Sequence, residues 1–240
     1  MTASFPPEGP AAGTPAPQGK SWFARLIGVF VAPAATFDDV RERPGWWAPL
    51  IVIVLAYFAI SLLIPEQLIR ELMESQMGAR GEVTPEQIEA GMKFARIWRY
   101  AGAIVGPLLS VLVTGGVLFL IFALLAGAEA RFVHFFSLAA YASLIQTLGA
   151  VVTTPIAVAE GDLQTRLSFA LLLPGLDEGF LYALLNGITI FGLWTAVVMG
   201  IGASRISRTV STGASIGIVL GLYALWVVAA AALAAVTGSA

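Results

Sequence analysis

Long uncharged apolar segments alternate along the chain with segments that hold its Asp, Glu, Lys and Arg residues. Five uncharged segments have lengths of 19, 26, 28, 24 and 23 residues. Because about 20 apolar residues in a helix cross a hydrocarbon core of roughly 30 Å, each segment is long enough to be a transmembrane helix. The predicted spans are Trp46–Ile64, Ala101–Ala126, Phe132–Ala159, Phe180–Ala203 and Ala214–Val236.

The pattern predicts an all-α fold, a polytopic transmembrane helical bundle with five spans that occupies residues 44–236. The apolar segments do not alternate polar and apolar positions, as the strands of a transmembrane barrel would. Charged residues make up 12% of the chain, about half of their share in an average soluble domain. The composition therefore excludes a soluble globule. Residues 237–240 are expected to form a short tail outside the membrane.

The segment before the first span is predicted to contain a disordered tail and two short helices. Residues 1–20 are rich in proline, glycine and alanine and form the tail. Within residues 21–43, apolar side chains recur at helical spacing over Ser21–Val31 and predict a helix that is too short to span the membrane. We expect this helix to lie at the membrane interface or to pack on the bundle's own inner end. A capping box at Thr36–Asp39 should start the second helix. Candidate interfacial anchors are Trp22, Phe23, Trp46 and Trp47.

The 36 residues between the first two spans carry eleven charges and two amphipathic patterns. We therefore expect an amphipathic helical hairpin on the membrane surface. Its second helix should begin at a capping box over Thr84–Gln87 and run into the second span. Between the third and fourth spans, Leu167–Leu173 is apolar but too short to cross and is expected to dip into the interface.

Charge and composition exclude several functions. The net charge of −2 gives no strong field for nucleic acid. With no cysteine and a single histidine, His134, the chain cannot form thiolate, iron–sulfur or His-rich metal sites, so we expect no cofactor and no metal. No Asp, Glu, Lys or Arg lies inside a predicted span, which argues against ion-coupled transport.

Two sequence features in the last span offer alternative functions. Gly213-Ala-Ser215-Ile-Gly217 matches the pattern around a hydrolase nucleophile, and His134 would be its base. This intramembrane serine hydrolase is a remote alternative. The favoured interpretation is a helix-packing face, since Gly213, Gly217 and Gly221 recur every four residues and let helices approach closely.

Two amides inside the spans, Gln146 and Asn186, form a candidate polar pair. Their distances along antiparallel spans place both about 9 Å from the outer boundary, so we predict a hydrogen bond between them, directly or through water. A bond to the own helix or to a nearby hydroxyl such as Thr189 is the alternative. A passive transporter or channel would need a continuous polar path, with Ser110, Thr114, Ser143, Gln146, Asn186 and Thr189 as its candidate lining.

The charges that flank the first span favour a cytoplasmic N-terminus. Seven Lys and Arg residues lie inside and six outside in this orientation, a difference too small to decide. Arg41 and Arg43 precede the first span closely, however, and Glu66 follows it. We predict a multi-pass protein of the cell membrane with its C-terminus outside.

The sequence resembles the bacterial type of the YIP-domain family of integral membrane proteins. The resemblance rests on Leu26–Pro33, Thr36-Phe37 and the Arg43–Leu50 segment with its paired tryptophans, and continues through Gly106-Pro107, Ala128–Phe136 and Ala139–Ser143. It implies five spans and a cytoplasmic N-terminus. The Rab-type GTPase binding of eukaryotic relatives is not carried over, because the short tail is a poor docking platform. We therefore expect a non-enzymatic protein that acts by helix–helix association or membrane organisation, with the lipid bilayer and a membrane-protein partner or a second copy as its partners.

Overall fold

The computed structural model describes residues 20–78, 84–161, 167–173, 175–176 and 178–237, so the predicted tails at 1–19 and 238–240 lie outside it. The described part is helical, with a single isolated β-bridge and no strand. In chain order its elements are α1 (Trp22–Val31), α2 (Pro33–Glu42), α3 (Trp47–Leu63), α4 (Glu66–Gly78), α5 (Pro85–Phe119), the π-helix η1 (Leu120–Leu125), α6 (Phe132–Glu160), the 3-10 helix η2 (Phe169–Leu172), α7 (Gly179–Gly187), α8 (Ile190–Ser207) and α9 (Thr212–Thr237).

The predicted all-α transmembrane bundle is confirmed, with four to five candidate spans. Four helical segments are long and apolar enough to cross a membrane: Pro85–Leu125, Phe132–Glu160, Ile190–Ser207 and Thr212–Thr237. The shorter α3 is the fifth candidate when it is taken together with α4, from which it bends by 83°.

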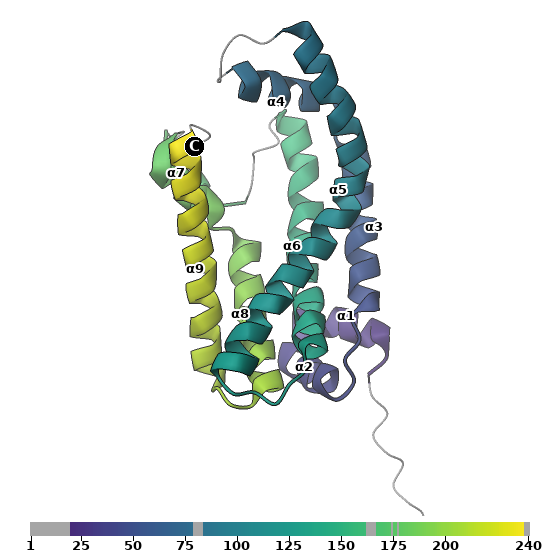
Figure 1. The fold of residues 1–240 in the computed structure, drawn as a ribbon, viewed down its shortest axis with the longest axis vertical. Coiled ribbons are helices and arrows are strands. Elements are labelled where there is room, and N and C mark those ends of the chain that lie inside the picture. The colour runs from purple at the N-terminus through teal and green to yellow at the C-terminus, as the bar shows by residue number, and fades with distance from the viewer. Residues whose placement is uncertain (1–19, 79–83, 162–166, 174, 177, 238–240) are drawn as a thin grey trace, which may run out of the picture.

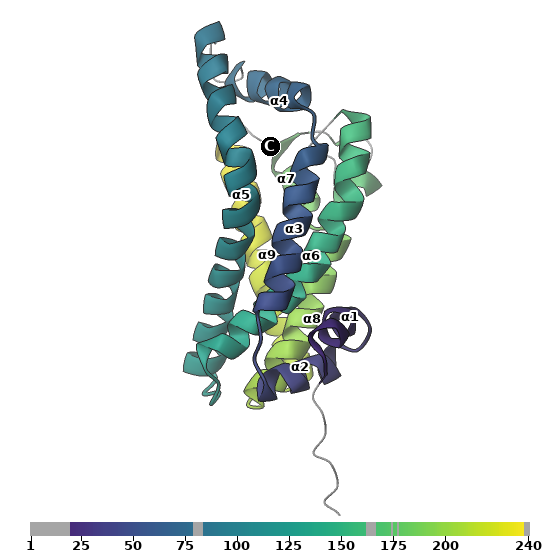
Figure 2. The ribbon, with the colours of Figure 1, turned by 90° about the vertical axis from the view of Figure 1, so that its right-hand side faces the viewer.

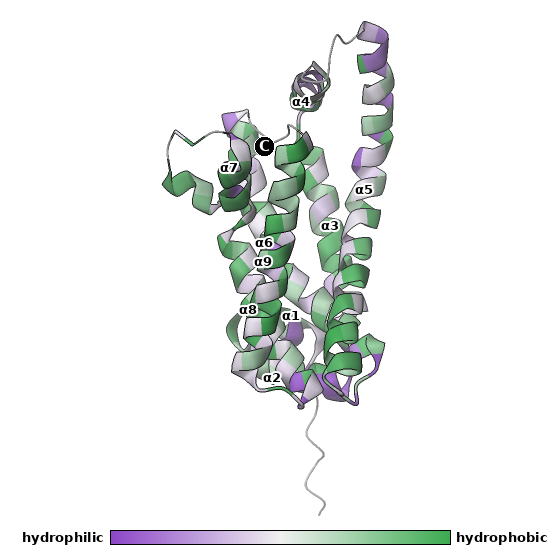
Figure 3. Ribbon diagram, turned by 60° about the vertical axis from the view of Figure 1, so that its left-hand side comes forward, coloured by the Kyte–Doolittle hydropathy of each residue, from purple (hydrophilic) through white to green (hydrophobic). Residues whose placement is uncertain are grey.

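Two ends of the bundle can be distinguished in Figures 1 and 2. The α1 end holds α1, α2, η1, the start of α6 and the turn between α8 and α9. The α4 end holds α4, the start of α5, α7 and the end of α9. Apolar residues cover the helices between the two ends, and hydrophilic residues gather at the ends (Figure 3). This distribution is the one expected of a protein that spans a bilayer.

The interior of the bundle is built around α6 and α8. α6 packs against α3, α5 and α8, and α8 packs against α2, α6 and α9. In the most apolar stretch of α6 and of α8, 61% of the residues are buried, against 22% in α5 and 17% in α9. α5 slants across α6 (Figure 1). It starts beside α3 at the α4 end, and its continuation η1 lies near α8 at the α1 end. α5 and α9 therefore form the outer walls of the bundle.

The second helix of the predicted hairpin is the first part of α5. Thr84 and Gln87 form the predicted capping box, in which the backbone N–H of Gln87 donates to Thr84 Oγ1 and the backbone N–H of Thr84 donates to Gln87 Oε1. The helix then continues without a break into span two and ends in η1, where the Ala126 N–H bonds to the Ile121 carbonyl five residues back at 2.9 Å. The predicted helix start and its continuation into the second span are therefore confirmed, and the charged residues of α5 lie in its first four turns.

The capping box predicted at Thr36–Asp39 is wrong. α2 begins earlier, at Pro33, and its N-cap residue Ala32 has no side-chain cap. The Thr36 hydroxyl donates instead to the Ala32 carbonyl at 3.1 Å, and Asp39 binds an arginine of α1. A proline suits the first turn of a helix because that position needs no N–H donor, and this preference outweighs the Thr–Asp spacing.

The prediction of one continuous span over residues 180–203 is also wrong. The chain is helical over α7, extended at Ile188 and Thr189, and helical again from Ile190, where Thr189 caps α8 by accepting from the Gly192 N–H at 3.0 Å. α7 packs against α9 and η2. The apolar run is therefore divided between two helices.

Candidate functional site

The break between α7 and α8 is held by a short extended pairing with the segment that follows α6. The Phe169 N–H donates to the Ile188 carbonyl at 3.0 Å, and Ser168 and Thr189 form an antiparallel bridge. The Tyr223 hydroxyl of α9 accepts from the Thr189 N–H at 3.2 Å and donates to the Gly187 carbonyl at 2.9 Å. Non-helical backbone at membrane depth is tolerated only where its polar groups are satisfied within the protein, and these bonds satisfy them.

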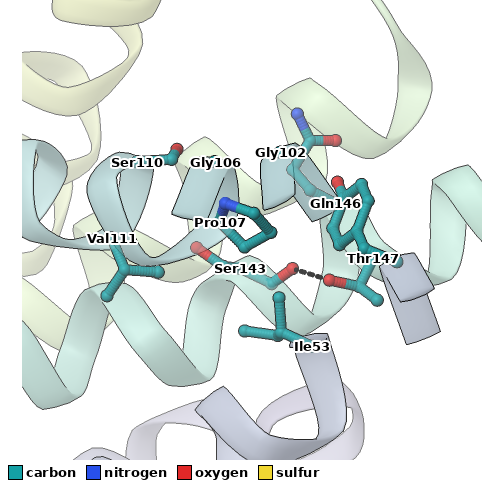
Figure 4. Close-up of a pocket in the computed structure, with 10 residues that line it drawn as sticks. Ile53, Gly102, Gly106, Pro107, Ser110, Val111, Ser143, Gln146 and Thr147 are labelled. Atoms are coloured by element: carbon teal, nitrogen blue, oxygen red, sulfur yellow. Dashed lines mark hydrogen bonds between the residues drawn. The ribbon is translucent and has the colours of Figure 1, made fainter. Parts of the chain in front are cut away.

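Two adjoining cavities lie beside this break, towards the α4 end. One, of about 350 Å³, lies between α3, α5 and α6 (Figure 4); the other, of about 330 Å³, lies between α6, α9 and the α7–α8 break. Tyr57 and Gln146 line both cavities. Pro107 and Ser110 of α5 face the first cavity and Thr189 faces the second. The site therefore combines four helices, α3, α5, α6 and α9, with the unwound backbone.

The structure does not join Gln146 and Asn186 by a hydrogen bond. Asn186 Oδ1 accepts from the Ser168 hydroxyl at 3.0 Å, so Asn186 follows the alternative of a nearby hydroxyl. Gln146 is exposed in the wall of the two cavities, and the described part of the chain holds no hydrogen-bond partner for it. The predicted pairing assumed a continuous fourth span. The break instead places Asn186 on the separate helix α7, beside Ser168.

The glycine face of α9 is open within this chain. If Gly213, Gly217 or Gly221 carried a Cβ atom, that atom would meet no neighbouring atom within 4 Å. The packed face of α9 holds Ser215 and Val219 instead. Close packing of the glycine face remains a prediction, and it would require a helix from outside this chain.

Glycines at other positions make the close approaches inside the bundle. A Cβ atom on Gly200 of α8 would lie 2.5 Å from the Ile216 Cα of α9, and one on Gly115 of α5 would lie 2.9 Å from the Phe136 Cα of α6. Both contacts are with backbone, which cannot move aside as a side chain can. These glycines set the distances between the helices.

The residues of the hydrolase alternative are not brought together. The Ser215 hydroxyl is completely buried in α9 and has no hydrogen-bond partner within the described residues. His134 Nδ1 accepts from the Arg131 N–H at 3.0 Å at the start of α6. Ser215 also lies within a helix, whereas the hydrolase motif needs a strand-to-helix turn.

The candidate interfacial anchors gather at the α1 end. The ring centroid of Trp22 lies 5.8 Å from that of Phe23 and 6.1 Å from that of Trp47, and Trp46 packs edge-on against Phe136 at 5.6 Å. The four anchors are exposed. Their surface is suited to the headgroup region, and their depth in the membrane stays a prediction.

Sequence reasoning missed Arg25, which ties α1 to the bundle. Its Nε donates to Asp39 Oδ2 at 2.5 Å and its Nη1 to the Arg43 carbonyl at 2.8 Å. The Arg25 and Asp39 side chains are only 10% and 11% exposed, while Ile27 and Val31 on the other side of α1 are exposed. α1 thus buries its charge and exposes apolar side chains, as expected in apolar surroundings. The spacing of apolar residues within one helix carries no signal for an ion pair between two helices.

Comparison with known proteins identifies the family. A family model of the Yip1 domain matches residues 27–235. The chain belongs to the Yip1 domain family. This confirms the resemblance found in the sequence. The matched Yip1 domain extends from within α1 into α9 and contains both cavities and the glycine face.

A curated relative supports the membrane assignment of this Yip1 domain. The chain is similar to "Membrane protein YknW" of Bacillus subtilis (strain 168), with 28% identity over 185 residues that cover 75% of this chain and 77% of the relative. No solved structure matches. The protein is a multi-pass membrane protein of the Yip1 domain family.

Proposed function

We propose that this protein acts without catalysis, as a membrane-organising scaffold that associates with a second copy of itself through the glycine face of α9. The observation that carries the proposal is the open surface at Gly213, Gly217 and Gly221, on a helix of which the apolar stretch is only 17% buried. Small residues four apart let two helix backbones approach closely in a bilayer, where van der Waals packing drives association. Two identical faces can pack about a two-fold axis, so a second copy is a suitable occupant.

The proposed orientation places the α1 end in the cytoplasm. Arg41 and Arg43 lie at this end, before the first span. Arg205 lies in the last turn of α8, and Arg208 follows that helix. Cytoplasmic loops of membrane proteins carry an excess of such residues. With α1 in the headgroup region of that leaflet, the scaffold would also act on the bilayer near it.

A passive pathway is less well supported. Ser110, Ser143, Gln146 and Thr189 of the candidate lining face the two cavities, whereas Thr114 and Asn186 do not. Towards the α1 end the interior is filled by completely buried apolar side chains, among them Phe122, Phe135 and Leu138. The cavities therefore form a site on one side of the membrane.

Cysteine cross-linking in native membranes tests the scaffold, because the chain has no cysteine of its own. Ala224 is exposed and lies three residues after Gly221, on the same side of α9. The Ala224→Cys variant should form a disulfide-linked dimer on mild oxidation. Adding Gly217→Leu should reduce the dimer by roughly fivefold or more, because a bulky side chain separates the backbones.

The matched control is Gly116→Leu in the Ala224→Cys background. Gly116 of α5 is also open, with nothing within 4 Å of a Cβ atom, but it lies on another helix. This variant should keep the dimer. Absence of the Ala224→Cys dimer, or an equal loss with Gly116→Leu, would refute self-association through α9.

A further inference from the structure

We propose that the two adjoining cavities form one site that binds a single uncharged amphipathic molecule from the membrane, with its hydrogen-bonding headgroup on Gln146. This inference is independent of the proposed self-association, because the cavities lie between helices of one chain.

The chemistry of the lining requires an uncharged ligand that can donate and accept hydrogen bonds. No Asp, Glu, Lys, Arg or His is among the residues that line either cavity in the described structure. The polar groups are one amide and several hydroxyls, and a bare charge in such surroundings would carry a large desolvation cost. The remaining lining is apolar or glycine, suited to a hydrocarbon chain.

Several of these polar groups lack a partner within the chain. The structure gives no hydrogen bond to the side chains of Gln146, Tyr57, Ser110 or Ser143 from any described residue, whereas Thr147, beside them in Figure 4, donates to the Ser143 carbonyl at 2.9 Å. An amide without a partner in hydrocarbon is costly. A ligand headgroup on Gln146 would remove this cost.

The position of the cavities along the bundle places them within the hydrocarbon region. Gln146 is fourteen residues into α6, about 21 Å along a path of roughly 30 Å. Arg99 donates to the last carbonyls of α3 at Ser61 and Ile64 and marks the α4-end boundary. Gly102 and Gly106, which line the first cavity, lie about 5 and 11 Å along α5 from Arg99. The ligand must therefore come from the leaflet on the α4 side.

Access to the site is lateral. Gln146 and Ser110 are exposed, and the exposed Trp226 of α9 lines the second cavity. These exposed lining residues place the openings of the cavities on the lateral surface of the bundle. A lipid-like molecule could thus enter between the helices without crossing an aqueous phase.

The size of the cavities suits such a molecule. Volumes of about 350 and 330 Å³ fall within the range of ligand sites. A single acyl chain is narrow enough to occupy both.

Photolabelling of the purified full-length protein in phosphatidylcholine nanodiscs tests this site. The probe is a monoacylglycerol that carries a diazirine in its acyl chain, and a phosphatidylglycerol with the same acyl chain is the charged comparison. The monoacylglycerol should label peptides of α5, α6 and α9, and more strongly than the charged probe does. Labelling of the Gln146→Leu variant should be about fivefold weaker, because the variant lacks the one or two hydrogen bonds that the amide would make to the ligand.

Leu148→Met is the matched control, because Leu148 is exposed on α6 but lines neither cavity. It should keep the labelling. Gly106→Leu, at a cavity-lining position with open space, should reduce labelling because the leucine side chain fills the site. This second variant tests the proposal if Gln146→Leu fails to fold. Equal labelling by both probes, or labelling that neither variant reduces, would overturn the proposal.

Discussion

The two ends of this Yip1 domain use the same kinds of interaction in different surroundings. The ion pair of the α1 end, Arg25–Asp39, is about nine-tenths buried, whereas Arg96 and Glu66 at the α4 end are 62% and 48% exposed. Helix crossings near the α1 end are tight, as at Gly115, and Gly106 towards the α4 end has open space. The α1 end therefore fixes the bundle, and the α4 end leaves room for a ligand.

The largest expected difference between the ends is in the ion pairs. Arg25→Ala leaves a buried Asp39 carboxylate without its partner and should lower the free energy of unfolding by about 3–5 kcal/mol. Arg96→Ala should cost at most about 1 kcal/mol, because its pair is exposed. Unfolding of both variants in mixed detergent micelles measures the difference. Similar losses would show that the two ends are equally dependent on their charges.

A smaller difference is expected at neighbouring glycines of α5. Gly115→Ala places a methyl group 2.9 Å from the Phe136 Cα and should cost about 1–3 kcal/mol through overpacking. Gly116→Ala meets nothing within 4 Å and should be neutral or stabilising by up to about 1 kcal/mol, since alanine favours a helix. The same unfolding measurement applies. A neutral Gly115→Ala would mean that α5 and α6 are not closely packed.

The smallest effect is expected at the break beside the cavities. Tyr223→Phe removes the hydroxyl that serves the Thr189 N–H and the Gly187 carbonyl and should cost about 0.6–2 kcal/mol. The loss should be local, so hydrogen exchange should accelerate at residues 187–190 and stay unchanged in α2. Unchanged exchange at the break would indicate that other groups hold it.

Hydropathy predicted the helices well and the polar contacts poorly. An apolar run of 18 residues or more must be helical in a bilayer, which explains the agreement for α6 and α9. Hydropathy does not detect the break after α7, because Ile188 and Ile190 continue the apolar run; only the Asn186-Gly187 pair and Thr189 mark it locally. Its stability comes from Ser168 and Tyr223, which are distant in sequence.

Periodicity identified which residues share a helix face but not which face is packed. Gly213, Gly217 and Gly221 do share a face, yet the bundle buries Ser215 and Val219 instead. Packing depends on the positions of the neighbouring helices, and the sequence of one helix does not contain them. For the same reason the sequence could place Gln146 in the third span without revealing the cavities beside it.

The π-helix at the end of α5 has a consequence for the evolution of the family. Its bond from the Ala126 N–H to the Ile121 carbonyl spans one residue more than an α-helical bond, so η1 amounts to a helix with an inserted residue. In an alignment, loss of one residue from Leu120–Leu125 would look like a harmless gap in an apolar stretch. It would nevertheless close the wide turn of η1 into an α-helical turn, and the packing around the completely buried Phe122 would have to change. Selection at this point of the chain should therefore act on the number of residues as well as on their hydrophobicity.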